Sequence, residues 1–175
     1  MKAKLLLYLG AFMVLAGCSK IKDATSITVD TELNTNIPVT VTGAAKSFNA
    51  LNAITFSETQ DLSLADNADL ESYLSKIHEI NLSNIVITIT GLGADQTINS
   101  LSLDVEGVGN IFLQTNITMT NNSFTPTVST VLIDQMGAKL QADKKLTFTV
   151  SGNVSGPMTF VVGCNMDAKV IVYTI

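Results

Sequence analysis

The sequence contains no arginine and no tryptophan, and all ten of its basic side chains are lysines. Surfaces that bind nucleic acid depend on dense basic patches and on the bidentate fork of arginine. The chain instead carries 15 carboxylates and has a formal net charge of −5. The sequence therefore argues against a nucleic-acid partner.

Charged residues are scarce, at 14% of the 175 residues, whereas hydrophobic residues make up 46%. A disordered acidic tail needs the reverse balance, because such a segment is too polar to bury a core. The long Glu, Lys, Ala and Leu tracts of helical bundles are missing, and Thr, Ser, Asn, Val and Ile dominate instead. This composition favours a single folded domain that is mainly β.

Histidine occurs once, at His78. A metal site built from several imidazoles is therefore excluded, and a Ser-His-Asp or Cys-His arrangement would have to use this residue. A simpler interpretation is that His78 ends a helix, where a cation stabilises the last carbonyls. Because no nucleophile, base and orienting group can be named together, we predict neither an enzyme nor a cofactor.

The two cysteines, Cys18 and Cys164, lie in very different surroundings. Apolar neighbours of Cys164, among them Val161, Val162 and Met166, favour a buried thiol. If Cys18 is modified, no intramolecular disulfide is available, and the fold must be held by its core even in an oxidising compartment.

The N-terminus has the pattern of an export signal. Lys2 and Lys4 precede an apolar run over residues 5–16, which is followed by Gly17 and Cys18. The run is about a dozen residues, shorter than the roughly 17 to 25 that a membrane-spanning helix needs. We therefore predict a signal peptide over residues 1–17.

Leu15-Ala16-Gly17-Cys18 resembles the lipobox of bacterial lipoproteins at all four positions. The resemblance implies export, transfer of diacylglycerol to the Cys18 thiol, cleavage before Cys18, and usually a third acyl chain on the new amino group. Each buried CH₂ adds about 0.8 kcal/mol to membrane binding, so two or three chains make release negligible. Cys18 is thus the predicted lipid attachment site and residues 18–26 a lipidated tether.

The residues after Cys18 bear on the location of the anchored protein. Ser19 stands where lipoproteins retained in the inner membrane typically carry Asp, and this resemblance indicates the outer membrane. Export to the cell surface is associated in some bacteria with an acidic run after the cysteine, whereas residues 19–23 include two lysines. We therefore expect the periplasmic face. After cleavage, eight lysines stand against 15 carboxylates, and this negative charge favours a body that hangs from the bilayer.

The body, residues 27–175, reads as short antiparallel strands separated by turn residues. Polar and apolar residues alternate with period two in most of these segments. The predicted strands are 27–29, 37–42, 53–57, 85–90, 101–105, 111–120, 146–150, 160–162 and 170–175. Pro38 is expected at a strand start or a sheet edge, and a bulge is expected at Gly163-Cys164-Asn165.

Two helices interrupt the strands, one over residues 66–78 and one around residues 132–140, where apolar residues recur at helical spacing. Gly137 weakens the second helix. The whole pattern predicts an antiparallel β-sandwich with two short helices. An immunoglobulin-like arrangement is one form of such a sandwich, although the Cys…Trp…Cys hallmark is absent.

An acidic cluster precedes and begins the first predicted helix. Its oxygen-rich side chains are of the type that binds calcium, but their spacing fits no EF-hand loop and no glycine supplies the sharp turn. A solvated helix start explains the same residues, so no metal site is predicted and calcium stays an open alternative. The cluster consists of Asp61, Asp66, Asn67, Asp69 and Glu71.

The sequence is best interpreted as a membrane-anchored, non-enzymatic binding or structural module of the bacterial cell envelope. It would contact the membrane through its lipid and a protein partner of the envelope through an exposed sheet edge, by strand addition, or through loops. The alternative is a pilus or adhesin subunit. The best-known lipoprotein-derived pilins are cleaved after an arginine, and this chain has none.

Overall fold

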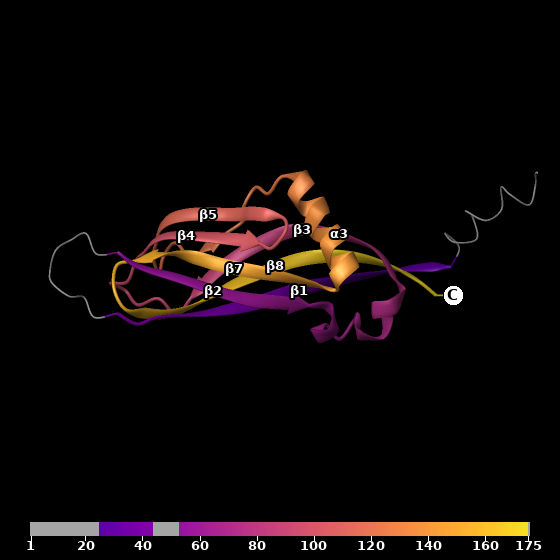
Figure 1. Cartoon of the computed structure of the whole chain (residues 1–175), viewed down its shortest axis with the longest axis horizontal. Helices are drawn as coiled ribbons and strands as arrows, with labels where there is room; N and C mark the ends of the chain where they lie inside the picture. Colours follow the sequence, from indigo (N-terminus) through magenta and orange to yellow (C-terminus); the bar gives the residue numbers. More distant parts are fainter. Residues whose placement is uncertain (1–24, 44–52, 175) are drawn as a thin grey trace, which may run out of the picture.

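The computed structural model describes residues 25–43 and 53–174, which form two four-stranded antiparallel sheets packed face to face (Figure 1). Sheet A contains, in spatial order, β1 (Ser26–Val41), β8 (Met158–Tyr173), β3 (Ile77–Thr90) and β6 (Ser123–Phe124). Sheet B contains β2 (Ile54–Ser63), β7 (Lys145–Val154), β4 (Ile98–Val105) and β5 (Gly109–Ile117). The predicted β-sandwich is confirmed. The signal peptide, the lipobox with Cys18 and residues 18–24 of the tether lie outside the described residues.

The strand order is that of a jelly roll. Pairing begins with β4 and β5 and continues outward along the chain with β3 and β6, β2 and β7, and β1 and β8. The chain is thus folded like one long hairpin that is wrapped into two sheets. The tip of this hairpin turns at Gly107 and Gly109, whose φ angles of 75° and 120° favour glycine. The immunoglobulin-like arrangement is therefore wrong, because that fold joins its strands in a different order.

Strand β1 merges the two strands predicted over residues 27–29 and 37–42 and pairs with β8 from Ser26 opposite Tyr173 to Val41 opposite Met158. It forms a lateral edge of sheet A, which explains why Pro38 is tolerated there. The start of β1 and the end of β8 consequently lie at the same end of the sandwich (Figure 1).

Strand β8 alternates between buried and more exposed residues except at Gly163, which is buried as well. Its pairing with β1 shows no register shift, so the bulge predicted at residues 163–165 is absent from β8. The irregularity lies in the neighbouring β3, between Ser83 and Val86. Asn84 adopts a φ of 49° there, and its amide donates a hydrogen bond to Asp167 at 3.1 Å.

The core fills the space between the sheets with the inward rows of both. Ile85, Ile87 and Ile89 are buried as their alternation predicts, and Phe148 and Phe160 are among the largest fully buried side chains. Cys164 is also fully buried, as expected. None of the described helices is long and apolar enough to cross a membrane.

The second predicted helix is confirmed as α3 (Thr130–Asp143), which is longer than expected and packs on β3 and β7. Ser129 caps its first turn by accepting a hydrogen bond from the Leu132 amide at 3.4 Å. Gly137 is buried, and a Cβ at this position would collide with the carbonyl oxygen of Ile80. Gly137 therefore lets the helix lie directly against β3.

The helix predicted over residues 66–78 forms only in part and not as an α-helix. The structure has two 3₁₀ segments here, η1 (Leu64–Asp66) and η2 (Glu71–Lys76), and His78 belongs to β3. Local side-chain bonds compete with a helix here, since the Asn67 side chain accepts from the Asp69 amide at 3.0 Å and donates to β1. The next residues must also enter the sheet, where Ile77 is buried opposite Val172.

Candidate binding groove

The structure separates the two residues that could form a Cys-His pair. His78 is exposed near the start of β3, where its ring stacks on Tyr173 with centroids 4.4 Å apart. Ile77, which precedes His78, pairs with Val172 of β8. Cys164 lies eight residues from Val172 along the same strand, and this separation corresponds to about 26 Å. Burial raises the pKa of the Cys164 thiol to about 12. A reactive dyad of these residues is excluded by their positions.

Asp61 and Asp69 of the acidic cluster are engaged by other partners. Asp61 accepts hydrogen bonds from Lys145 at 2.8 Å and Thr147 at 2.6 Å, and these bonds hold the pKa of its carboxyl below the ordinary value of 3.8. Asp69 accepts a hydrogen bond from the Thr31 hydroxyl at 2.8 Å. Within residues 25–43 and 53–174, no three His, Cys, Asp or Glu side chains are grouped so that they could hold a metal ion.

A groove of about 690 Å³ lies on one lateral side of the sandwich, between the edge of sheet B and the chain that runs from sheet A into α3. One wall consists of residues 110–114 of β5, and the other of residues 123–129, with Leu132 of α3 at one end. On the opposite lateral side, β1 contacts β2. The two sheets are thus in contact along one lateral side and are separated by this groove along the other.

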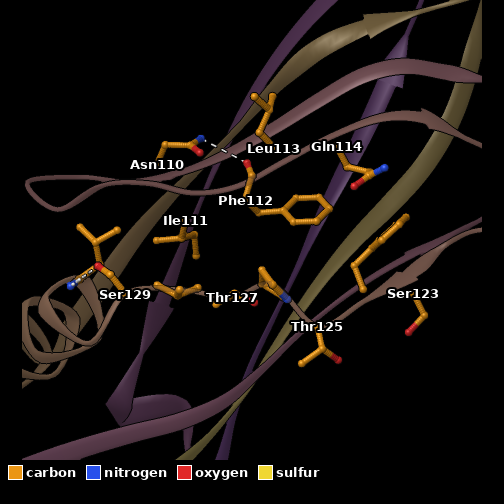
Figure 2. Close-up of a pocket in the computed structure, with 13 residues that line it drawn as sticks. Asn110, Ile111, Phe112, Leu113, Gln114, Ser123, Thr125, Thr127 and Ser129 are labelled. Atoms are coloured by element: carbon orange, nitrogen blue, oxygen red, sulfur yellow. Dashed lines mark hydrogen bonds between the residues drawn. The ribbon is translucent and has the colours of Figure 1, made fainter.

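A bulge in β5 shapes the floor of the groove. The pairing of β5 with β4 shifts by one residue between Phe112 and Asn110, so Ile111 and Phe112 are both buried although they are consecutive. Figure 2 shows these two side chains on the side of β5 that faces Thr125 and Thr127. The bulge therefore turns two large apolar side chains toward the groove where a regular strand would turn one.

Hydrogen bonds and ring contacts fix this floor. The Asn110 amide donates to the Ser102 hydroxyl at 2.7 Å and to the carbonyl oxygens of Leu103 and Phe112 at 3.3 and 3.2 Å. Figure 2 shows the bond to Phe112. The Phe112 ring lies against Phe124 of β6, with centroids 5.3 Å apart. The two sheet edges are consequently joined at the bottom of the groove by apolar contact.

The groove has no charged side chain in its lining, and no histidine or cysteine either. One exposed apolar residue also lines it: Leu113 is exposed to 67%, and Val131, exposed to 63%, precedes the lining residue Leu132 in the chain. Exposed apolar surface in a groove is typical of an interaction site. The lining can bind an apolar or neutral group but supplies no acid, base or thiolate.

Sequence reasoning missed this groove, because it is built from the edges of two different sheets. One signal was present: no charged residue occurs between Glu106 and Asp134. This is the longest uncharged stretch of the sequence, 27 residues against 21 for the next longest, residues 146–166. The stretch contains both walls of the groove.

No family model and no curated protein matches the chain. Several solved structures are similar to it in part. The decameric BFDV capsid protein matches with a TM-score of 0.41 and 6% identity, over 85% of this chain and 99% of that chain. The Desmodium yellow mottle tymovirus matches with a TM-score of 0.35 and 10% identity, over 85% and 90%. A nora virus structure gives a TM-score of 0.40 at 7% identity, and the match covers 85% of this chain and 62% of that one. Likeness of this degree carries no argument about what the chain does.

Proposed function

We propose that the protein is a lipid-anchored, non-enzymatic binding module of the bacterial cell envelope, and that the groove between β5 and residues 123–129 is its binding surface. The observation that carries the proposal is the groove itself, which is open, apolar at its floor and free of charge. Such a surface is suited to holding a partner. It offers no group that could take or give a proton in a reaction.

The resemblance of Leu15-Ala16-Gly17-Cys18 to a lipobox supports the anchor. Acyl chains on Cys18 would hold the body at the membrane, on the periplasmic face of the outer membrane as Ser19 and the two following lysines suggest. The described part of the chain begins only seven residues after Cys18. The groove would then be presented close to the membrane that carries the protein.

The anchor is tested by expressing the chain and its Cys18→Ala variant in a bacterium fed with labelled palmitate. The unmodified sequence should incorporate the label and sediment with the outer membrane, and Cys18→Ala should do neither. Recovery of an unlabelled protein that retains Met1 would contradict the anchor.

Binding is tested by placing a photoreactive amino acid at the position of Leu113, beside the groove, or at the position of Ile27, an exposed apolar residue of β1 that serves as the control. Illumination of living cells should give one adduct of defined mass from position 113 and none of that mass from position 27. The same adducts from both positions, or none from either, would refute the groove as the binding surface.

A further inference from the structure

Strand β5 is the least protected of the sheet edges. The edge strands of sheet A are β1 and β6, and those of sheet B are β2 and β5. An open edge invites another strand to pair, and proteins usually block it with proline, with charges, with a bulge or by keeping the strand very short. Proline, a charge or short length blocks three of these four edge strands, whereas β5 has a bulge alone.

The three strands are blocked by proline, by charges or by their length. Strand β1 carries Pro38 as well as Asp30 and Glu32. Strand β2 places Glu58 opposite the buried Val150, which is an inward-pointing charge at an edge. Strand β6 is only two residues long. Strand β5 spans nine residues with no charge and no proline, and its bulge at Ile111 widens the apolar floor.

From this contrast we infer that the groove takes up one extended, uncharged segment of a partner protein, which joins sheet B as an additional strand beside β5. This inference rests on the proposed function and specifies its ligand. The wall over residues 110–114 offers about 17 Å of strand edge, enough for five residues of an extended chain. The bound segment would supply hydrogen bonds to backbone groups of β5 that face the groove.

Charge complementarity defines the chemistry of the segment. The chain carries 25 charged side chains and a net charge of −5, but none of the charged residues lines the groove. A charged side chain brought into the groove would lose part of its water without gaining a charged partner. The alternate side chains that face Ile111, Phe112 and Phe124 should therefore be apolar, and the others neutral.

A free segment fits the groove better than a second copy of this chain does. A strand bound beside β5 lies between β5 and residues 123–127, so it has a wall on each side. The β5 strand of a folded copy is attached to β4 and would bring its own wall over residues 123–129 into the same space. Self-association is consequently an outcome against the inference.

Two glutamines provide a matched pair of variants. Gln114 of β5 lies opposite the buried Leu101, and Gln60 of β2 lies opposite the buried Phe148 at the other lateral edge of sheet B. Each side-chain amide donates to the carbonyl oxygen of the following residue, at 3.2 Å and 3.3 Å. Gln114→Lys places a charge at the groove, whereas Gln60→Lys places the same charge at the protected edge.

The probe is a phage-displayed library of random linear heptapeptides, selected on the full-length processed protein in detergent micelles. Selection should enrich uncharged sequences with apolar residues at alternate positions. A synthetic peptide of the enriched sequence should slow amide hydrogen exchange in residues 109–117. Gln114→Lys should weaken its binding at least tenfold, and Gln60→Lys should leave the affinity unchanged.

Three results would overturn the inference. These are the absence of enriched peptides, protection of β2 instead of β5, or equal effects of Gln114→Lys and Gln60→Lys. A dimer in sedimentation velocity that Gln114→Lys dissociates would assign the edge to a second copy instead. If these tests fail while the photoreactive group at position 113 still gives its specific adduct, strand addition is wrong and the proposed binding function stands.

Discussion

Replacing Gly137 by alanine sets two effects against each other. In the interior of a helix, alanine is favoured over glycine by about 1 kcal/mol. At Gly137, however, the added methyl group would overlap the backbone carbonyl oxygen of Ile80, which belongs to β3 and has little freedom to move. Helix α3 would have to lift away from the sheet.

The size of the effect follows from what the lift disturbs. Met136 and Leu140, on the same side of α3 as Gly137, are fully buried, so a shift of even half an ångström loses part of their contact with the sheet. Overpacking a tight site costs about 1 to 3 kcal/mol. After the gain in helix propensity, Gly137→Ala should destabilise the protein by up to about 2 kcal/mol, or lower Tm by up to about 8 °C.

Urea unfolding followed by far-ultraviolet circular dichroism measures this change, since the protein lacks tryptophan. Ala138→Gly, at the exposed neighbouring position, is the control and should lose about 1 kcal/mol through propensity alone. Propensity by itself predicts opposite signs for the two variants, whereas the close contact with Ile80 predicts that both are destabilised. A more stable Gly137→Ala protein would refute the reasoning.

Three further predictions concern single side chains. The pKa rise from 9.0 to about 12 lowers the thiolate fraction of Cys164 about a thousandfold, so iodoacetamide at pH 8 should label it in 8 M urea but not in the folded protein; labelling at equal rates would contradict its burial. Because the pKa of Asp61 is lowered, its ionised form stabilises the fold above the ordinary value of 3.8, and this contribution is lost as the pH falls through the lowered pKa. Asp61→Asn should therefore be less stable than the unmodified protein at pH 7 and equally stable in strong acid, and a difference independent of pH would exclude this explanation. Lys144 ends α3 with a φ of 60°, so Lys144→Gly should raise the free energy of unfolding by up to about 1 kcal/mol in urea titrations, and a loss would show that the Lys144 side chain matters more than its backbone.

The alternation of residues along the chain predicts most strands and much of the core. Ile85, Ile87 and Ile89 illustrate this, because a half-buried strand must bury every second side chain. Periodicity does not specify which strands pair, and the order of strands in the two sheets therefore differs from the immunoglobulin-like alternative. The polar stretch between residues 30 and 36 likewise concealed the continuity of β1, which depends on its pairing with β8.

The two predicted helices differ for a tertiary reason. Leu70, Leu74 and Ile77 have helical spacing, but Ile77 is required in sheet A and Asn67 ties the preceding turn to β1. The helix that contains Gly137 forms despite the glycine, because close packing on β3 outweighs the loss in propensity. The groove could not be derived from local pattern at all, since it depends on the approach of residues far apart in the fold.

The start of β1 and the end of β8 lie at the same end of the sandwich, and this has a mechanical consequence. Tyr173 lies opposite Ser26, and the Thr174 amide donates a hydrogen bond to the Thr25 carbonyl oxygen at 2.8 Å. A force that pulls these ends apart opens β1 from β8 one residue pair at a time, so the molecule yields at low tension. A force between the N-terminal end and a protein seated on sheet B is carried by the whole face-to-face core and meets far more resistance.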